Sequence, residues 1–261
     1  MRIGILANEP SVLPKLNPYL PPGWKEDRAP VVDRLYTVMT GSITGDAGES
    51  NAPLVMIYQD TDIIAATDSI ESAGEFMEAD LQFYIAEAAR NRIFVHAGVV
   101  GWKGQAILLP GRTFAGKTSL VAELVRAGAV YYSDEFAPID RKGIVHPFAR
   151  PLSIRGSATE KPVKQVVEEL GGRAGKKPLP VGLVVVTHYR EGAHWRPRRL
   201  SPGHGILELL AHTVPARSQP DVVLSTLQAI VARASVWKGV RGDAKEVAQL
   251  ILGPSGYLGF R

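Results

Sequence analysis

Short apolar runs of strand length alternate along the second half of the chain with longer segments whose apolar residues recur at helical spacing. Residues 105–109 contain an apolar run from Ala106 to Leu109, which predicts a buried strand. Residues 117–127 predict a helix that ends at Gly128, because apolar residues gather on one of its faces. Residues 129–132 predict the next strand. The pattern therefore reads strand, loop, helix, strand from residue 105 onward.

The same patterns predict further elements on both sides of this unit. Ser72 and Glu75 form a capping box that opens a helix running to about residue 92. A strand at 93–100 and a turn at 101–104 lead into the strand at 105–109. Beyond residue 150 the spacing predicts a short strand at 152–156, helices at 161–170, 202–213, 220–234 and 243–252, and a buried strand at 181–187.

The N-terminal part of the chain has a different character. Residues 8–30 are rich in proline and polar residues, which predicts loops and turns. Short apolar runs at 2–6 and 35–39 predict strands, and those at 54–58 and 63–66 predict a hairpin. We therefore expect a small β-rich lobe over residues 1–70 and a second domain over residues 71–261.

Composition narrows the class of protein. With 261 residues and 45% hydrophobic content, the chain can bury a full core. Thirty basic and 26 acidic residues give a net charge of +4, too mild to indicate nucleic acid as a partner. Cysteine is absent, which excludes disulfides and thiolate metal sites. The apolar start is too short for a signal peptide, and no run is long enough to span a membrane, so we expect a cytoplasmic protein without a membrane partner.

Between the strand at 105–109 and the following helix, the sequence satisfies G-x-x-x-x-G-K-[ST], the pattern of a phosphate-binding loop. Glycines let backbone N–H groups approach a polyphosphate, the lysine reaches the β- and γ-phosphates, and the hydroxyl can bind Mg²⁺. The helix N-terminus adds its positive end. The alternative is a glycine-rich surface turn that binds nothing. The predicted nucleotide-binding residues are Gly111, Arg112, Thr113, Phe114, Ala115, Gly116, Lys117, Thr118 and Ser119.

Two carboxylates follow the strand after this helix. Asp134 and Glu135 begin 17 residues after Lys117. An acid at the end of a strand beside the loop can hold Mg²⁺, with Thr118, as a Walker-B residue does. The second acid can take a proton from an attacking hydroxyl or orient a water. The alternative is a solvated acidic turn.

A basic stretch with interleaved aromatic residues lies at 188–199 (HYREGAHWRPRR). Such a stretch can contact phosphate or a substrate with acidic groups. The alternative is a solvated hairpin tip.

These residues together resemble the catalytic domain of HPr kinase/phosphorylase and its relatives, whose nucleotide fold resembles that of phosphoenolpyruvate carboxykinase. His96 precedes Gly111 by 15 residues, the acidic pair follows Lys117 at the family spacing, and 152–156 (LSIRG) resembles the family segment L-E-I-R-G. The resemblance covers roughly residues 93–156. Residue 153 is serine here, where the family has a metal-binding glutamate.

The resemblance implies a role for each matched residue. Glu135 would be the base that activates a serine-type hydroxyl, and Asp134 would bind or orient Mg²⁺. His96 would position the acid pair or the phosphate, although a histidine at a strand end is also a common core residue. Lys117 and Arg155 would lie at the transferred phosphoryl group. The family also assembles as oligomers, which implies a homo-oligomer.

The sequence thus predicts an α/β fold: a P-loop nucleotide-binding core of the HPr kinase/phosphoenolpyruvate carboxykinase type with a mixed sheet, plus a smaller β-rich N-terminal lobe. The predicted function is an ATP-dependent kinase, with GTP as the other nucleotide open, that uses Mg²⁺ and phosphorylates a hydroxyl on a peptide, protein or small molecule. Two alternatives stay open. One is an NTPase switch without an acceptor, and the other is a degenerate kinase-like module that binds nucleotide or peptide without turnover.

Overall fold

A computed structural model describes residues 1–43, 52–112, 115–154 and 162–253. It has helices packed on mixed β-sheets, so the α/β class is confirmed. The chain divides into two compact units, Met1–Ile85 and Ala86–Arg261. This division falls later than residue 70, because most of the helix α2 (Ile70–Ala88) packs in the first unit. No helix in the described ranges is both long and apolar enough to cross a membrane.

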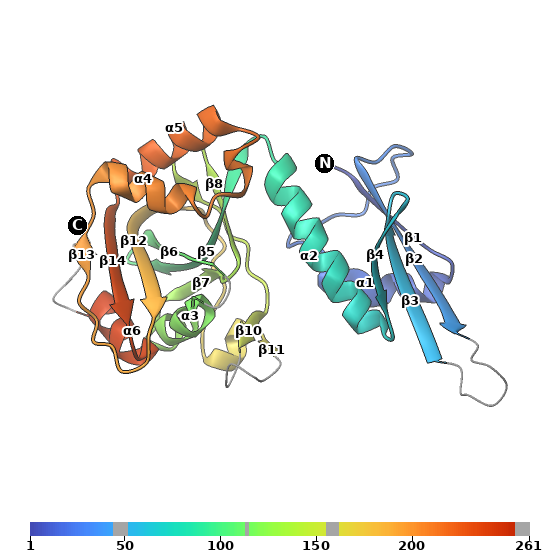
Figure 1. Cartoon of the computed structure of the whole chain (residues 1–261), viewed down its shortest axis with the longest axis horizontal. Helices are drawn as coiled ribbons and strands as arrows, with labels where there is room; N and C mark the ends of the chain where they lie inside the picture. The colour runs from blue at the N-terminus through green and yellow to red at the C-terminus, as the bar shows by residue number, and fades with distance from the viewer. Residues whose placement is uncertain (44–51, 113–114, 155–161, 254–261) are drawn as a thin grey trace. The chain divides into compact units, whose positions relative to one another are not determined.

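The first unit is a four-stranded sheet with α2 against it (Figure 1). Its strands are ordered β1-β2-β3-β4, with β1 parallel to β2 and the other pairs antiparallel, and β3 and β4 form the predicted hairpin. The segment predicted as loop between β1 and β2 contains short helical turns. The bounds are β1 (Ile3–Ala7), η1 (Pro10–Val12), α1 (Leu13–Leu16), η2 (Asn17–Tyr19), β2 (Arg34–Ile43), β3 (Ala52–Gln59) and β4 (Asp62–Thr67).

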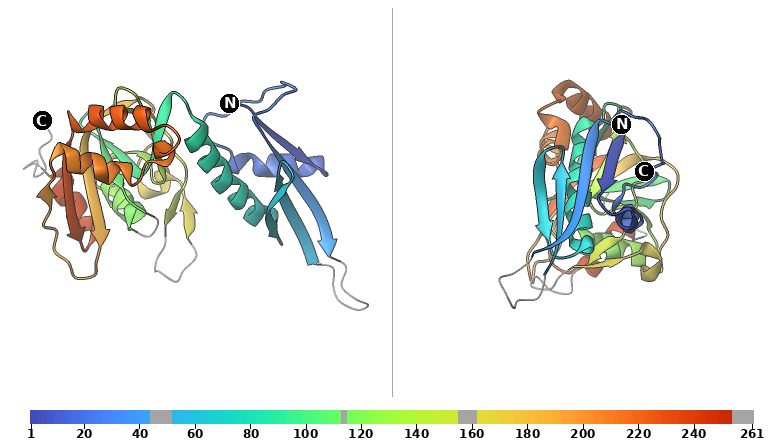
Figure 2. Two further views of the ribbon diagram at one scale, coloured as in Figure 1. Left: turned by 45° about the horizontal axis from the view of Figure 1, so that its top comes forward. Right: turned by 90° about the vertical axis from the view of Figure 1, so that its right-hand side faces the viewer.

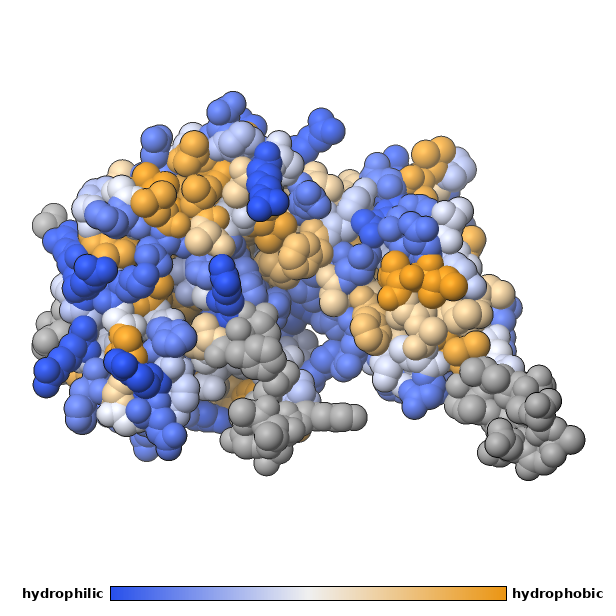
Figure 3. Space-filling model, viewed as in Figure 1, coloured by the Kyte–Doolittle hydropathy of each residue, from blue (hydrophilic) through white to orange (hydrophobic). Residues whose placement is uncertain are grey.

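Alternation along these strands sends one set of side chains into a core and the other to the surface. Tyr36, Val38 and Ile57 are completely buried. Leu6, Met39 and Ile63 are exposed, and Figure 3 shows apolar residues gathered over this sheet. One face of the small sheet is therefore covered by its own helices, while apolar side chains of its strands reach the surface.

The second unit is built on a larger mixed sheet. Its strands are ordered β13-β14-β12-β6-β5-β8-β9, and β7 also pairs with β5. A separate hairpin joins β10 to β11. The strand bounds are β5 (Arg92–Trp102), β6 (Gln105–Pro110), β7 (Val130–Ser133), β8 (Phe136–Asp140), β9 (Ile144–Val145), β10 (Leu152–Ile154), β11 (Val163–Gln165), β12 (Leu179–Tyr189), β13 (Arg198–Arg199) and β14 (Ser235–Arg241).

Helices cover both faces of this sheet (Figures 1 and 2). One core lies between the sheet and α4 and α5, and a second lies between the sheet and α3 and α6. This explains why β6 is apolar from Ala106 onward: Leu108 packs into the first core and Ile107 into the second. The helical bounds are α3 (Lys117–Arg126), η3 (Val167–Leu170), α4 (Pro202–Leu210), η4 (Val214–Ala216), α5 (Pro220–Val231) and α6 (Ala244–Leu252).

The helix predicted at 161–170 is wrong. The described part of this segment is the strand β11 followed by the single turn η3. Val163 and Val166, which the helical pattern places inward, are exposed, and only Val167 is buried. Pairing of β11 with β10 supplies backbone hydrogen bonds that override the local helical spacing.

Strand direction brings several chain segments to one edge of the sheet. Neighbouring strands β6, β12 and β14 are parallel, and β5 runs antiparallel to both β6 and β7. Strands β6, β7, β12 and β14 therefore all point the same way. Their carboxyl ends, at Pro110, Ser133, Tyr189 and Arg241, meet at this edge, and each is followed by a loop. Loops at the carboxyl ends of parallel strands are where α/β proteins place their ligands.

Candidate nucleotide-binding and catalytic site

The predicted phosphate-binding loop leaves β6 at Pro110 and enters α3 at Lys117. Gly116 stands immediately before α3 with a φ of 77°, a left-handed conformation that favours glycine. No side chain in the described ranges caps the N-terminus of α3, and the first turn of α3 contains no acidic residue. The first N–H groups of this ten-residue helix thus remain available to an anion. Thr113 and Phe114 lie outside the described residues.

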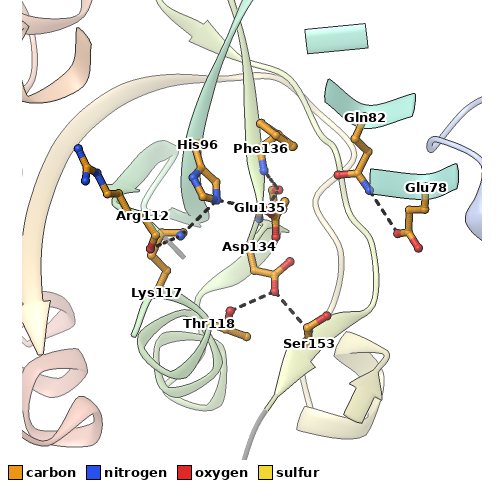
Figure 4. Close-up of polar contacts among 11 residues, drawn as sticks. Glu78, Gln82, His96, Arg112, Lys117, Thr118, Asp134, Glu135, Phe136 and Ser153 are labelled. Atoms are coloured by element: carbon orange, nitrogen blue, oxygen red, sulfur yellow. Dashed lines mark hydrogen bonds and ion pairs between the residues drawn. The ribbon is translucent and has the colours of Figure 1, made fainter. Parts of the chain in front are cut away.

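Lys117 is 8% exposed, and its side chain folds back over the loop (Figure 4). Its Nζ donates to the backbone oxygen of Arg112 at 2.9 Å and lies 3.4 Å from Nε2 of His96. Burial lowers the pKa of Lys117, against the opposing charges of Glu135 and Asp134. The described acceptor of this buried ammonium is an uncharged loop carbonyl. An anionic ligand would give the ammonium a charged partner.

His96 connects this lysine to the second acid of the pair. Its Nε2 lies 3.2 Å from Oε1 of Glu135. Nε2 cannot donate to Glu135 and accept from Lys117 at once, and the carboxylate charge favours donation to Glu135. Burial opposes ionisation of Glu135, but the hydrogen bond from His96 and the charges of His96, Lys117 and Arg150 outweigh it and lower the pKa. Glu135 is thus ionised at neutral pH, and its side chain is 52% exposed.

Asp134 points away from Glu135 and toward the start of α3 (Figure 4). Oδ2 lies 3.4 Å from Oγ1 of Thr118 and accepts from the backbone N–H of Ser153 at 3.4 Å, while Oδ1 lies 3.1 Å from the hydroxyl of Tyr131. Burial and the charge of Glu135 raise the pKa of Asp134 to about 6, against these hydrogen bonds. Asp134 makes no ion pair with any described residue. The two neighbouring acids therefore have different surroundings and opposite pKa shifts.

The side chains around Asp134 fit a magnesium ion bound together with phosphate. Among the described residues there is no cluster of three or more histidine, cysteine, aspartate or glutamate side chains able to hold a metal alone. Mg²⁺, however, is commonly held by one or two protein oxygens plus substrate phosphates and water. A hydroxyl oxygen and a carboxylate oxygen 3.4 Å apart at the end of the loop provide such a pair. Arg155, predicted at the phosphoryl group, lies outside the described residues.

Arg241 was not predicted from the sequence. It ends β14, is 2% exposed and donates from Nη2 to the backbone oxygen of Gly116 at 2.6 Å. Its Nη1 donates to the backbone oxygen of Gly242 at 2.9 Å, and its guanidinium lies 5.5 Å from the ring centre of Tyr189. The sequence of residues 235–241 (SVWKGVR) has no motif that links this segment to the loop.

Comparison with known proteins found distant structural similarity and no sequence match. No protein-family model matches the chain, and no curated protein matches it. Among solved structures, the HPr(Ser) kinase/phosphatase from Coxiella burnetii is similar at 15% identity, over 60% of this chain and 90% of that chain, with a TM-score of 0.35. We therefore base the function on the residues of the site.

Proposed function

We propose that this protein is an ATP-dependent phosphotransferase that moves the γ-phosphoryl group to a serine-type hydroxyl of a peptide, protein or small molecule. The observation that supports this most is the grouping of charges around the loop. Lys117, His96 and Glu135 follow one another at 3.4 and 3.2 Å on one side, and Thr118 and Asp134 lie 3.4 Å apart on the other.

The phosphate chain would bind along residues 111–118. The uncapped start of α3 supplies N–H donors, and the left-handed Gly116 turns the chain into the helix. Lys117 would release the backbone oxygen of Arg112 and donate to phosphate oxygens instead. Its buried ammonium would then have a charged acceptor. Positioning and charge neutralisation of this kind provide most of the catalysis in phosphoryl transfer.

Thr118 and Asp134 would hold Mg²⁺ at the same phosphates. When bound, the ion neutralises charge that develops on the phosphate oxygens. Asp134 is buried without an ion-pair partner among the described residues. Burial makes the ionised carboxylate unfavourable, and the raised pKa of Asp134 reflects this cost. A cation at this carboxylate would relieve the cost, which supports Asp134 as the ligand.

Glu135 would accept the proton of the attacking hydroxyl. Its carboxylate is ionised and half exposed, so a hydroxyl on a larger acceptor can reach it. His96 holds the carboxylate from the side of Lys117, which orients it toward the phosphates. A general base of this kind contributes about 10²- to 10⁴-fold to the rate.

The test is ³¹P NMR of the protein with Mg·ATP and pools of acceptors that carry serine-type hydroxyls. We expect a phosphomonoester resonance in at least one pool. Glu135→Gln should slow its appearance about 10²- to 10⁴-fold while ATP still binds. Glu169→Gln, an exposed glutamate in η3, is the matched control and should retain wild-type activity.

Two results would contradict the proposal. Release of inorganic phosphate at one rate with and without every acceptor would instead indicate an NTPase. Unchanged transfer by Glu135→Gln would show that another group takes the proton.

A further inference from the structure

A pocket of about 700 Å³ opens beside the loop, and its described lining residues do not include Asp134. Gly111 and Arg112 of the loop form one wall, and the ends of β12 and β14 form another. Arg196 and Arg198, from the basic stretch at 188–199, close a third side. The structure thus brings the predicted loop and part of that stretch, which are far apart in the sequence, to the same cavity.

Basic groups dominate the polar lining of this pocket. Arg112, Arg196, Arg198 and Lys238 all line it, together with two histidines, and its described lining residues include no aspartate or glutamate. Lys238 is paired with Glu208 at 2.5 Å. The three arginines make no ion pair with any residue in the described ranges. A cavity with this excess of cations favours an anionic ligand.

The phosphates of a bound nucleotide would not use this excess. They already have the loop N–H groups, Lys117 and the start of α3. A purine or pyrimidine base carries no negative charge that would pair with Arg196 and Arg198, the two arginines of the lining that lie outside the loop. The apolar part of the lining, including Val186 and Val240, leaves room for the carbon skeleton of a ligand.

The pocket is connected to the proposed catalytic groups through His212. His212 lines it, and the backbone oxygen of His212 accepts from the N–H of His96 at 2.7 Å. His96 in turn contacts Glu135 and Lys117. A ligand that contacts His212 is therefore separated by one residue, His96, from Glu135 and Lys117.

We infer that this pocket binds a carboxylate or phosphate group of the phosphoryl acceptor, so that the acceptor is an acidic molecule. The inference rests on the proposed function, since it gives the chemical class of the second substrate. Arg196 and Arg198 bind the anionic group, and the apolar lining packs against the rest of the ligand.

The experiment uses two simple anions, ¹³C-labelled succinate and inorganic phosphate, titrated by NMR into protein saturated with Mg·AMP-PNP. Saturation removes the loop as a competing anion site, and the two probes distinguish a carboxylate pocket from a phosphate pocket. The test variant is Arg196→Gln/Arg198→Gln. The control, Arg190→Gln/Arg199→Gln, removes the same charge from exposed positions of the same stretch that do not line the pocket.

We expect at least one probe to bind the nucleotide complex of the wild type and of the control variant. Loss of two charge-assisted contacts should weaken the binding of that probe roughly tenfold or more in the test variant. The affinity for AMP-PNP should stay within about twofold in both variants, because neither changes the loop.

Three results would overturn the inference. The first is that neither probe binds the wild-type complex, and the second is that probe affinity falls equally in the control variant. The third is that the test variant loses affinity for AMP-PNP, which would assign the pocket to the nucleotide. Failure of AMP-PNP to bind at all would instead refute the proposed function. In that case, probe binding to the nucleotide-free protein that still depends on Arg196 and Arg198 would support the pocket on its own.

Discussion

Replacing Asp134 with asparagine should stabilise the nucleotide-free protein at neutral pH. Asp134 is 6% exposed, and its pKa is raised from 3.8 to about 6. The difference of about 2.2 pH units, at about 1.36 kcal/mol each, corresponds to about 3 kcal/mol as an upper limit. Asparagine removes the charge but keeps an oxygen that can accept from Tyr131 or Ser153.

The gain should depend on pH in a defined direction. A carboxyl whose folded pKa is raised binds its proton more tightly in the folded state, so wild-type stability is lost as pH rises through about 6. The advantage of Asp134→Asn over wild type should therefore be near zero at about pH 4 and reach its full value by about pH 7 to 8. The same variant should bind Mg·ATP more weakly, since it lacks the carboxylate proposed to hold Mg²⁺.

Urea unfolding followed by tryptophan fluorescence measures this. Trp102, Trp195 and Trp237 lie in the second unit, so the signal mainly reports the unit that contains Asp134. Asp140→Asn is a control of opposite sign. Burial raises the Asp140 pKa, but the hydrogen bond and charge of His146 together with the backbone N–H groups of Ile144 and Lys142 outweigh it and lower that pKa. A lower stability of Asp134→Asn than of wild type at pH 8 would contradict a raised pKa of Asp134. So would a stability difference between the two proteins that does not change with pH.

Three further predictions concern the loop. Gly116→Ala should lower the free energy of unfolding by at least about 1–2 kcal/mol and weaken nucleotide binding, because φ is 77° and the added Cβ would collide with Arg241. An unchanged melting temperature would contradict this. Arg241→Met should weaken ATP binding severalfold by freeing the Gly116 carbonyl, and Arg241→Lys should restore part of it, as calorimetry would show. Affinity for Mg·ATP should fall by up to about tenfold per pH unit below about pH 6 as Asp134 is protonated, and Asp134→Asn should flatten that dependence.

The elements around the loop were predictable because their signals are local. The apolar run of β6, the single apolar face of α3 and Gly128 at its end each depend on neighbours within a few residues. The proximity of Glu135, His96 and Lys117 was implied by the family resemblance, and the contacts at 3.2 and 3.4 Å agree with it. The roles of these residues stay predictions.

What the sequence missed depends on pairing between distant segments. Apolar residues recur at helical spacing over residues 161–170, but residues 163–165 pair with β10 instead. Arg241 reaches Gly116 only because β14 lies beside β12 and β12 beside β6 in the sheet. Asp134 and Glu135 are adjacent in the sequence but have opposite pKa shifts. Burial raises the pKa of Asp134, and the contact with His96 helps to lower that of Glu135. Neither cause can be recognised from the sequence positions of the two acids.

The proposed function requires that residues 111–118 bind a nucleoside triphosphate. Calorimetric titration of Mg·ATP into wild type and Lys117→Ala tests it most directly. We predict one site per chain in the wild type, and an affinity roughly ten- to a hundredfold weaker in Lys117→Ala through loss of a charge-assisted contact. Equal affinities in the two proteins, or no binding by wild type, would contradict the account.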